Sequence, residues 1–280
     1  MPHLLLGLIG DNIAASRAPA LHELAGRLSG LEVRYDRLVP RELGLDFDGV
    51  FSACGEEGRR GVNVTYPYKE RAAARVRIDD AAVRRLGAVN TVLFEPDGPR
   101  GYNTDYTGFL AAYRDARGMA RPGPVCLAGA GGVGKAVAFG LVSLGLSELR
   151  IVERDIPKAE LLAEALLAVS PRIDVMITTD PAKAAPGAAG FVNCTPIGMV
   201  GYPGTPLMRP LLTGGEWAFD AVYTPRDTQF LRDAAAEGLH VISGYELFFH
   251  QGVAAWSIFS GGRRVDPEAL RAGLASLAAA

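Results

Sequence analysis

The sequence predicts an α/β protein with two α/β domains, and three observations lead to that prediction. Its 280 residues are about twice the length of an average domain. Short apolar runs alternate with longer helical stretches along most of the chain, which is typical of parallel sheets joined by helices. A Gly/Pro/Arg-rich connector around residues 118–124 separates two sets of strand candidates. We therefore expect two sheets, one on each side of this connector.

The composition excludes several other classes of protein. Hydrophobic residues make up 49% and charged residues 21% of the chain, as in ordinary soluble domains. A formal net charge of −2 leaves no broad basic surface for a nucleic-acid backbone. The three cysteines have no CxxC spacing, which suits a reducing compartment and predicts no metal site. We find no signal peptide and no membrane segment of about 20 apolar residues. We expect a cytoplasmic monomer or homodimer acting on a small molecule.

The first half of the chain predicts one βαβ unit and two further strands. A buried apolar run predicts the first strand, and alternation with period two predicts the next. Later strand candidates stop at Pro67 and at the turn 96–99, because proline removes a backbone donor. The predicted strands are 4–9, 33–39, 61–65 and 88–94, with a helix at about 19–28 between the first two.

The second half predicts another sheet, which begins directly after the connector. Its strand candidates are 125–128, 149–153, 175–178, 190–194, 217–222 and 240–242. Helices are predicted at 135–144, 159–168, 230–237, 246–260 and from about Pro267. We expect residues 1–106 and 245–280 to form one domain and residues 107–244 the other, with the C-terminal helices returning to the first domain.

A glycine-rich turn follows the first strand of the second set. Residues 129–134 fit the pattern G-x-G-x-x-G, and they lie between an apolar strand and a helix, where the pattern has physical meaning. The first glycine permits a tight turn, the second lets a pyrophosphate approach the backbone, and the third lets helix and strand pack closely. The sequence therefore predicts a Rossmann-type dinucleotide site formed by Gly129, Ala130, Gly131, Gly132, Val133 and Gly134.

An acidic residue at the end of the following strand bears on the choice of dinucleotide. Glu153 lies about 20 residues after the glycine turn, where a carboxylate accepts hydrogen bonds from both ribose hydroxyls and repels a 2′-phosphate. Arg154 follows directly and can stack on adenine or pair with a 2′-phosphate. We expect both residues to contact the cofactor, with NAD favoured and NADP still open. A solvated charged turn is the alternative.

Two titratable residues of the first half follow predicted strands. Lys69 comes after the strand that stops at Pro67, and Asp105 comes after the strand candidate 88–94 and its turn. If both enter one cleft, the carboxylate orients the amine, and the two form a proton-transfer pair. Taken singly, each is more often a surface charge.

Segments distributed over nearly the whole chain give a specific resemblance. The segments are SRAPALH at 16–22, NVTYPYK at 63–69, GAVNT at 87–91, NTD at 103–105, NCTPIGM at 193–199, DAVY at 220–223 and residues 244–251. In this order they resemble the shikimate/quinate dehydrogenase family. GLIG at 7–10, His22-Glu23, the glycine turn and Glu153 look more like its NAD-preferring quinate/shikimate branch.

The resemblance implies a reaction and a set of site residues. It implies an oxidoreductase that transfers a hydride between the ring hydroxyl of shikimate or quinate and NAD(P) in a cleft between the domains. The alcohol proton would leave through Lys69, held by Asp105. The residues implied to bind the substrate carboxylate and hydroxyls are Ser16, Thr65, Asn90, Tyr223 and Gln251, and those implied to bind the cofactor are Thr195, Met199 and Gly244.

One residue departs from the family pattern. Ala18 stands where the substrate-carboxylate loop usually has a second Ser or Thr, so one donor to the carboxylate is missing. A lost hydrogen bond to a charged group costs roughly 1.5–3 kcal/mol unless it is replaced. The substrate alternatives are therefore shikimate, quinate or a related acid such as an aminated cyclohexene carboxylate. A sensor that binds dinucleotide without turnover is the alternative outside the enzymes.

Overall fold

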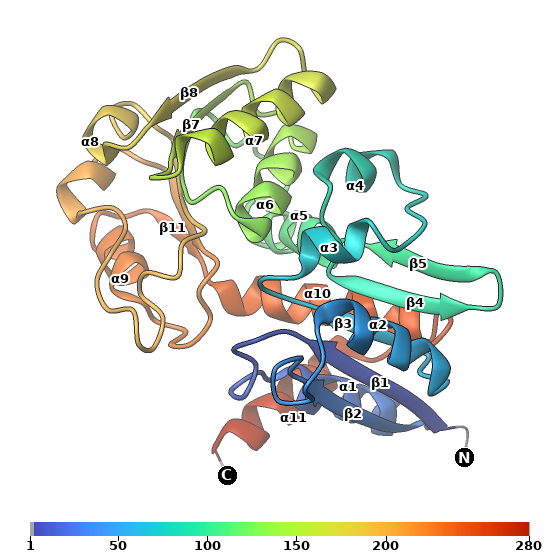
Figure 1. Ribbon diagram of the computed structural model, residues 1–280. Helices are drawn as coiled ribbons and strands as arrows, with labels where there is room; N and C mark the ends of the chain where they lie inside the picture. The colour runs from blue at the N-terminus through green and yellow to red at the C-terminus, as the bar shows by residue number, and fades with distance from the viewer. Residues whose placement is uncertain (1–2, 280) are drawn as a thin grey trace. The chain divides into compact units, whose positions relative to one another are not determined.

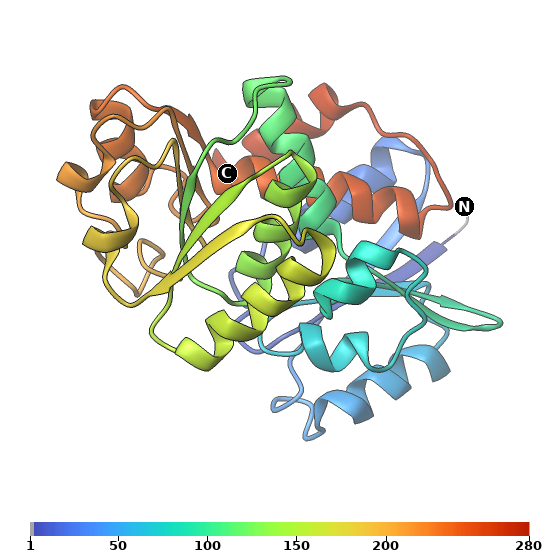
Figure 2. The same cartoon turned by 90° about the horizontal axis from the view of Figure 1, so that it is seen from above.

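The chain divides into two compact units in a computed structural model, which describes residues 3–279. The first unit comprises Met1–Thr104 and Gln251–Ala280, and the second comprises Asp105–His250. Figure 1 labels most elements of each unit, and Figure 2 shows the same elements from above. The predicted division has its crossings at 106/107 and 244/245, so residues 105–106 and 245–250 belong to the second unit here.

The sheet of the first unit mixes parallel and antiparallel strands. Its order is β2-β1-β3-β4-β5, with β1 parallel to β2 and β3, and with β4 antiparallel to both of its neighbours. The carboxyl ends of β1, β2 and β3 therefore lie at one edge of the sheet, where ligands bind in open α/β sheets. The strands are β1 (His3–Ile9), β2 (Glu32–Leu38), β3 (Gly61–Val64), β4 (Thr91–Glu95) and β5 (Gly98–Tyr102).

The predicted strand 88–94 is wrong at its start, and one strand was not predicted. β4 begins at Thr91, and β5 covers part of the predicted turn. Glu95 pairs with Gly98 and Phe94 with Pro99, which leaves only two residues in the turn. A proline fits here because β5 is an edge strand, where one backbone donor is not needed for pairing.

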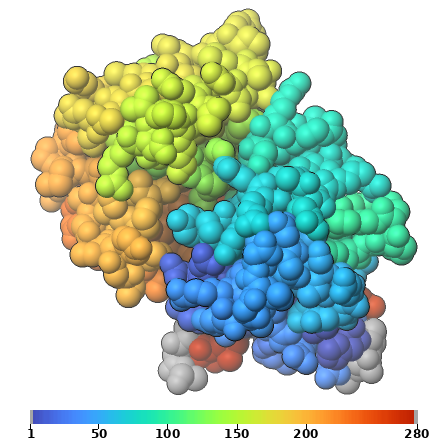
Figure 3. Space-filling model, in the orientation of Figure 1, coloured from blue at the N-terminus to red at the C-terminus, as the bar shows by residue number. Residues whose placement is uncertain are grey.

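Helices cover both faces of this first sheet. On one face Phe47, Phe51 and Val83 pack against Val62 and Val92. On the other face Leu8, Tyr35 and Leu93 pack against Ala18 and Phe259. Figure 3 shows α2 at the surface of the unit on the viewer's side. The helices are α1 (Ala18–Leu28), α2 (Phe47–Glu56), α3 (Lys69–Ala73), α4 (Ala81–Leu86), α11 (Pro267–Ala279) and the second half of α10 (Gly244–Phe259).

The sheet of the second unit is entirely parallel. Its order is β11-β10-β9-β6-β7-β8, so the strand order reverses beside β6, and the carboxyl ends of β6, β7, β9 and β10 share one edge. This reversal is the position where doubly wound sheets bind nucleotides. The strands are β6 (Val125–Ala128), β7 (Glu148–Val152), β8 (Asp174–Thr178), β9 (Gly190–Asn193), β10 (Trp217–Asp220) and β11 (His240–Ile242).

Two helical layers cover the second sheet. On one side Phe109 of α5 contacts Gly140 of α6 and the ring of Phe219, and on the other side Phe230 and Leu231 of α9 pack against the sheet. Figure 2 shows α9 and α5–α7 on opposite sides of these strands. The remaining bounds are α5 (Thr104–Arg117), α6 (Gly132–Ser143), α7 (Ile156–Val169), α8 (Pro181–Ala184), η1 (Arg209–Leu212) and α9 (Gln229–Ala236).

Three helices begin two or three residues earlier than the sequence predicts. α6 starts at Gly132 instead of Lys135, α7 at Ile156 instead of Ala159, and α10 at Gly244 instead of Glu246. Glycine at the first position of a helix is tolerated because the first N–H groups need no acceptor within the helix. In the described part of the chain, no helix combines the length and apolarity needed to cross a bilayer.

Candidate active site and dinucleotide loop

The glycine turn after β6 contains two glycines that the fold itself requires. Gly129 has a φ of +95°, and a Cβ there would lie 2.9 Å from the carbonyl of Cys194. A Cβ on Gly134 would collide with the carbonyl oxygen of Gly129. The turn and the approach of α6 to β6 therefore exclude any larger residue at either position.

Gly131 differs from these two, because the protein leaves space beside it. The nearest atom to a Cβ built there is Nζ of Lys158, at 3.7 Å. Its φ of −72° is open to any residue. The fold alone therefore does not explain this glycine, but close approach of a ligand to the backbone does.

The loop presents donors and a cation to such a ligand. Gly131 caps α6 in an extended conformation, so the N–H groups of the first turn of α6 point out of the helix as an anion-binding site. Lys158 brings an ammonium group to the same side from the first turn of α7. No sequence motif predicts this role for Lys158, because its place beside the loop depends on how α7 packs.

Glu153 lies directly after β7 and its carboxylate is tied to the backbone of the same loop. One oxygen accepts the Ala130 N–H at 2.8 Å, and the other accepts the N–H groups of Arg154 and Asp155. Burial alone would raise the pKa of Glu153, but these hydrogen bonds and nearby Lys158 outweigh it and hold the pKa below its ordinary value. The carboxylate is therefore ionised beside the glycine turn, while Arg154 is exposed.

The ends of β9 and β10 complete this edge of the second sheet. The methyl of Thr195 lies 3.0 Å from the place of a Gly129 Cβ, so the loop after β9 packs on the glycine turn. Gly244 lies against the carbonyls of Asp220 and Val222, where a side chain would not fit. The Tyr223 ring stacks on Phe248 with centroids 5.1 Å apart. Met199 is partly exposed in the loop after β9.

Two carboxyl groups lie close to the end of β9. Asp220 is fully buried, and burial raises its pKa to about 6 although Thr228, Val222 and Asn193 each donate a hydrogen bond to it. Burial and the charges of Asp220 and Asp105 together raise the pKa of the Cys194 thiol. Asp105, in the first turn of α5, is therefore within electrostatic reach of the loop that packs on Gly129.

In the first unit, Ser16 and Thr65 lie in the loops after β1 and β3. The Ser16 hydroxyl accepts the Ala18 N–H at 3.3 Å, so it helps to start α1, and its carbonyl accepts a hydrogen bond from Arg37. The Thr65 N–H donates to the Ile9 carbonyl at 2.9 Å, and its methyl contacts Gly10. These contacts hold the two loops together at the carboxyl edge of the sheet.

Lys69 is the first residue of α3 and is half-buried. Its carbonyl accepts the Val89 N–H at 2.9 Å, which ties the start of α3 to the segment before β4. Asn90 is the next residue of that segment and is buried with only 4% of its surface exposed. Thr104 donates its N–H to Asn90 Oδ1 at 2.6 Å, and its hydroxyl contacts Gln251 Oε1 at 3.4 Å. The Thr104 hydroxyl also lies 3.1 Å from Asn90 Oδ1, so the side chains of Asn90 and Gln251 both contact this hydroxyl.

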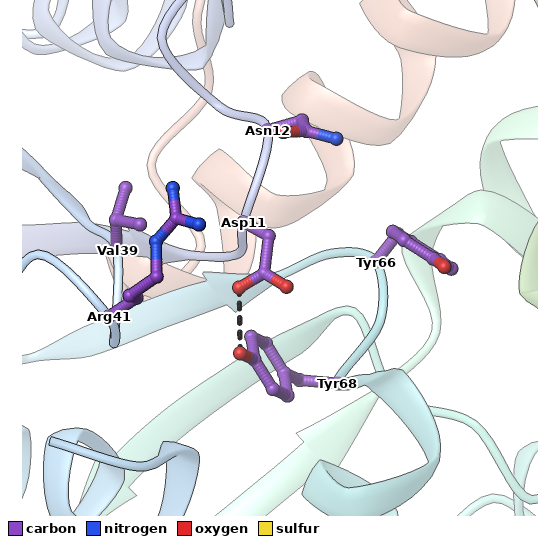
Figure 4. Close-up of a pocket in the computed structure, with 6 residues that line it drawn as sticks. All are labelled: Asp11, Asn12, Val39, Arg41, Tyr66 and Tyr68. Atoms are coloured by element: carbon purple, nitrogen blue, oxygen red, sulfur yellow. Dashed lines mark hydrogen bonds between the residues drawn. The ribbon is translucent and has the colours of Figure 1, made fainter.

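A hollow of about 400 Å³ opens beside these loops, at the carboxyl ends of β1, β2 and β3. Figure 4 shows the Asp11 carboxylate accepting a hydrogen bond from the Tyr68 hydroxyl, at 2.7 Å, with Arg41 on the other side. The sequence analysis proposed none of its lining residues for the site, because they come from the loops after three different strands. They are Asp11, Asn12, Val39, Arg41, Tyr66 and Tyr68.

Fold and site together define a class of protein. A parallel sheet with a glycine turn at a helix N-terminus, and with an ionised Glu at the end of the next strand, is a dinucleotide-binding unit. A second α/β unit with polar residues at its strand ends accompanies it. This is the arrangement of a nicotinamide-dependent oxidoreductase.

Comparisons with known proteins identify the family. Residues 8–92 match the family model described as shikimate dehydrogenase substrate binding domain. The chain is 38% identical to a quinate/shikimate dehydrogenase (NAD(+)) of Corynebacterium efficiens, with 98% of each chain covered. It is 37% identical to a shikimate dehydrogenase (NADP(+)) of Pseudarthrobacter chlorophenolicus, covering 99% of this chain and 96% of that one. The chain therefore belongs to the shikimate/quinate dehydrogenase family.

A solved structure supports the same assignment. Quinate dehydrogenase from Corynebacterium glutamicum in complex with NAD superimposes with a TM-score of 0.91 at 34% identity, covering 99% of this chain and 100% of that one. The predicted family and the predicted fold class are thus confirmed. The roles of the individual site residues stay predictions.

Proposed function

We propose that the protein oxidises the ring hydroxyl of shikimate or quinate with NAD(P), giving 3-dehydroshikimate or 3-dehydroquinate. The observation that carries the proposal is the open space at Gly131, between two glycines that the fold requires. A glycine that packing does not need, at a helix N-terminus, suits a pyrophosphate lying against the backbone. When bound, the nicotinamide supplies the hydride acceptor.

We assign substrate binding to the first unit and dinucleotide binding to the second. In this proposal Lys69 takes the proton of the reacting hydroxyl, and Asp105 orients the ammonium group of Lys69. The half-burial of Lys69 at the start of α3 and the burial of Asp105 at the start of α5 suit groups held on rigid elements.

We assign recognition of the substrate to short polar side chains at element ends. Ser16 would bind the carboxylate, and Thr65 would bind a ring hydroxyl from the loop after β3. Asn90 and Gln251, which share Thr104, would bind further ring hydroxyls, and Tyr223 would cover the substrate from the loop after β10. Hydroxyl recognition of this kind discriminates strongly, because an unmatched buried polar group costs about 1–3 kcal/mol.

We propose NAD as the preferred dinucleotide. Glu153 is ionised beside the glycine turn, where it would accept ribose hydroxyls and repel a 2′-phosphate. Arg154 and Lys158 are the cations near this position, and they keep NADP as a weaker alternative. Of the cofactor residues, Thr195 and Gly244 would shape the nicotinamide end, with Met199 beside them.

The test is a comparison of initial rates for shikimate and quinate, each with NAD and with NADP, followed by the absorbance of the reduced cofactor. Turnover of either acid with NAD, at least tenfold faster than with NADP, is the expected result. In Glu153→Gln we expect the preference for NAD to fall by about tenfold, because one repulsive charge is removed. Binding of dinucleotide without turnover of either acid would identify a sensor and contradict the proposal.

Ala18 favours one second candidate, a dehydrogenase of a related acid. Its methyl group is buried at the start of α1, where the family pattern has a hydroxyl. Ala18→Ser should lower KM for shikimate or quinate if those acids are the substrates. An unchanged KM would favour a different acid.

A further inference from the structure

A chain of buried polar side chains begins on the α1 face of the first sheet. His22 stacks on Tyr35 with centroids 5.0 Å apart and planes 3° apart, and both are buried. The Tyr35 hydroxyl donates to Asn63 Oδ1 at 2.8 Å, and the His22 ring lies near the same Asn63 side chain. Burial lowers the pKa of His22 to about 3, so the ring is neutral. The acceptor end of the Asn63 carboxamide therefore faces Tyr35.

The donor end of Asn63 consequently faces the opposite way. Its Nδ2 donates to Thr91 Oγ1 at 3.0 Å and to the Asn90 carbonyl at 3.2 Å. Because Thr91 accepts from Asn63, its own proton is directed onward, to Asn90 Oδ1 at 3.2 Å or to Thr104 Oγ1 at 3.1 Å. In each of these hydrogen bonds the donor is therefore on the side of Tyr35, and the acceptor is nearer the carboxyl edge of the sheet.

Asn90 lies at the end of one branch. Its Oδ1 is within hydrogen-bond distance of the Thr104 N–H, the Thr104 hydroxyl and the Thr91 hydroxyl. A carboxamide whose oxygen faces these donors must turn its NH₂ group the other way. Among the described residues, Asn90 Nδ2 has no hydrogen-bond partner. The side-chain atoms that lack a partner and are also fully buried do not include it, so this nitrogen is accessible.

Gln251 lies at the end of the other branch. Its Oε1 is the acceptor in the 3.4 Å contact with the Thr104 hydroxyl. This contact directs the oxygen of Gln251 toward Thr104 and the NH₂ group away from it. Both carboxamides thus have the same polarity relative to Thr104, with the oxygen toward the buried chain.

We propose that this buried chain, running from His22 and Tyr35 through Asn63, Thr91 and Thr104, orients Asn90 and Gln251 as hydrogen-bond donors and so sets which ring substituent the site accepts. The inference rests on the proposed function, because it takes Asn90 and Gln251 to face the substrate. Thr91, Thr104 and Asn63 are positioning residues in this proposal, and they act through the two carboxamides.

The polarity has a chemical consequence for the substrate. A ring hydroxyl has lone pairs that accept from two NH₂ groups, whereas an ammonium group at the same ring position has only donors. The site should therefore reject the ammonium form of an aminated analogue and accept its neutral amine. Two opposed donors left unpaired in a buried site should together lower kcat/KM by roughly 30- to 10⁴-fold.

The first measurement uses the wild-type enzyme with shikimate and with its analogue that has an amino group in place of a ring hydroxyl. We expect kcat/KM for the analogue to be at least about 100-fold lower at pH 7. The deficit should shrink as pH rises through the pKa of the analogue's own amine, because the neutral amine has a lone pair. A deficit that does not change with pH would contradict the proposal.

The second measurement tests the chain by substitutions on β4. Thr91→Val removes the hydroxyl but keeps the shape, and we expect discrimination against the amine to fall by about tenfold. Thr91→Ser keeps the hydroxyl and should retain the discrimination. Val92→Ala, which removes buried volume at the next residue, is the matched control for a loss of stability alone. If Thr91→Val and Val92→Ala change the discrimination equally, Thr91 has only a structural role.

The third measurement replaces one of the two hydrogen-bond donors by an acceptor. Asn90→Asp keeps an acceptor for Thr104 but replaces the NH₂ group by an oxygen. The ratio of kcat/KM for the ammonium analogue to kcat/KM for shikimate should therefore rise by about tenfold or more. No relative gain would overturn the orientation argued for Asn90. Absence of turnover of both shikimate and quinate in the wild type would instead contradict the proposed function, so the two failures are distinguishable.

Discussion

The two α/β units place polar groups at the carboxyl edges of their parallel strands, but they use different parts of the chain to do so. In the second unit the edge beside β6 consists of backbone N–H groups at the start of α6. In the first unit the edge consists of side chains, with Asn90 and Gln251 joined through Thr104. A backbone site binds a phosphate, which needs many donors but little discrimination. A side-chain site distinguishes one hydroxyl pattern from another.

The buried titratable groups of the two units also differ. Burial lowers the pKa of His22 in the first unit and raises the pKa of Asp220 in the second, so both groups favour their neutral form. The neutral His22 ring stacks on Tyr35, while Asp220 accepts from Asn193, Val222 and Thr228. The two units should therefore respond in opposite directions to a change of pH.

The largest expected effect separates chemistry in the first unit from cofactor binding in the second. Lys69→Ala should lower kcat by about 10²- to 10⁴-fold, because the reacting hydroxyl loses its proton acceptor. Dinucleotide affinity, measured by fluorescence titration, should stay within about twofold. The exposed Lys183 of α8 provides the control, since Lys183→Ala should leave kcat unchanged. Unchanged turnover in Lys69→Ala would remove this residue from the mechanism.

The next effect contrasts two glycines of the same turn. Gly134→Ala should lower the free energy of unfolding by roughly 2–3 kcal/mol, because the new methyl meets the Gly129 carbonyl oxygen. Gly131→Ala should leave the stability near that of the wild type but weaken dinucleotide binding by about tenfold or more. Denaturant unfolding and cofactor titration on both variants check this. If Gly131→Ala binds dinucleotide as the wild type does, no ligand lies against that glycine.

A smaller effect tests the neutral His22 of the first unit. Its pKa in the folded state is about 3 against 6.5 in the unfolded state, so its contribution to stability is complete above pH 6.5 and is lost as pH falls toward 3. Between pH 6.5 and 5 the wild type should lose about 1.6 kcal/mol of unfolding free energy that His22→Phe retains. The exposed His240 supplies the control variant His240→Phe. Parallel pH curves for wild type and His22→Phe would contradict this assignment.

The smallest effect has the opposite sign and belongs to the second unit. The pKa of Asp220 rises from 3.8 to about 6 on folding. Its contribution to the free energy of unfolding is therefore complete below pH 3.8 and is lost as pH rises through about 6. Between pH 5 and 7 the wild type should lose about 1.4 kcal/mol that Asp220→Asn does not lose. Urea unfolding at a series of pH values measures the difference. If the wild type instead gained unfolding free energy relative to Asp220→Asn over this range, the prediction would be wrong, and ionisation of the buried carboxyl would cost little.

The sequence determined the parts of this protein that depend on local spacing. The glycine turn 129–134, the strand before it and Glu153 could be predicted, because a turn that packs this tightly restricts residue type at fixed positions. The ordered motifs also predicted the family. The edge strand β5 was not predicted, because proline in a strand is tolerated only where the sheet leaves its donor unpaired.

The tertiary structure decided what no local pattern contains. Asn63, Asn90, Thr104 and Gln251 are far apart in the sequence, and only the packing of β3, the start of β4 and the second half of α10 around Thr104 brings their hydrogen-bonding atoms within reach. The position of Lys158 beside Gly131 likewise depends on the packing of α7. A hydrogen bond requires two atoms within about 3 Å, and sequence spacing sets that distance only between neighbours in the chain. The donor direction of a carboxamide is therefore a property of the folded structure.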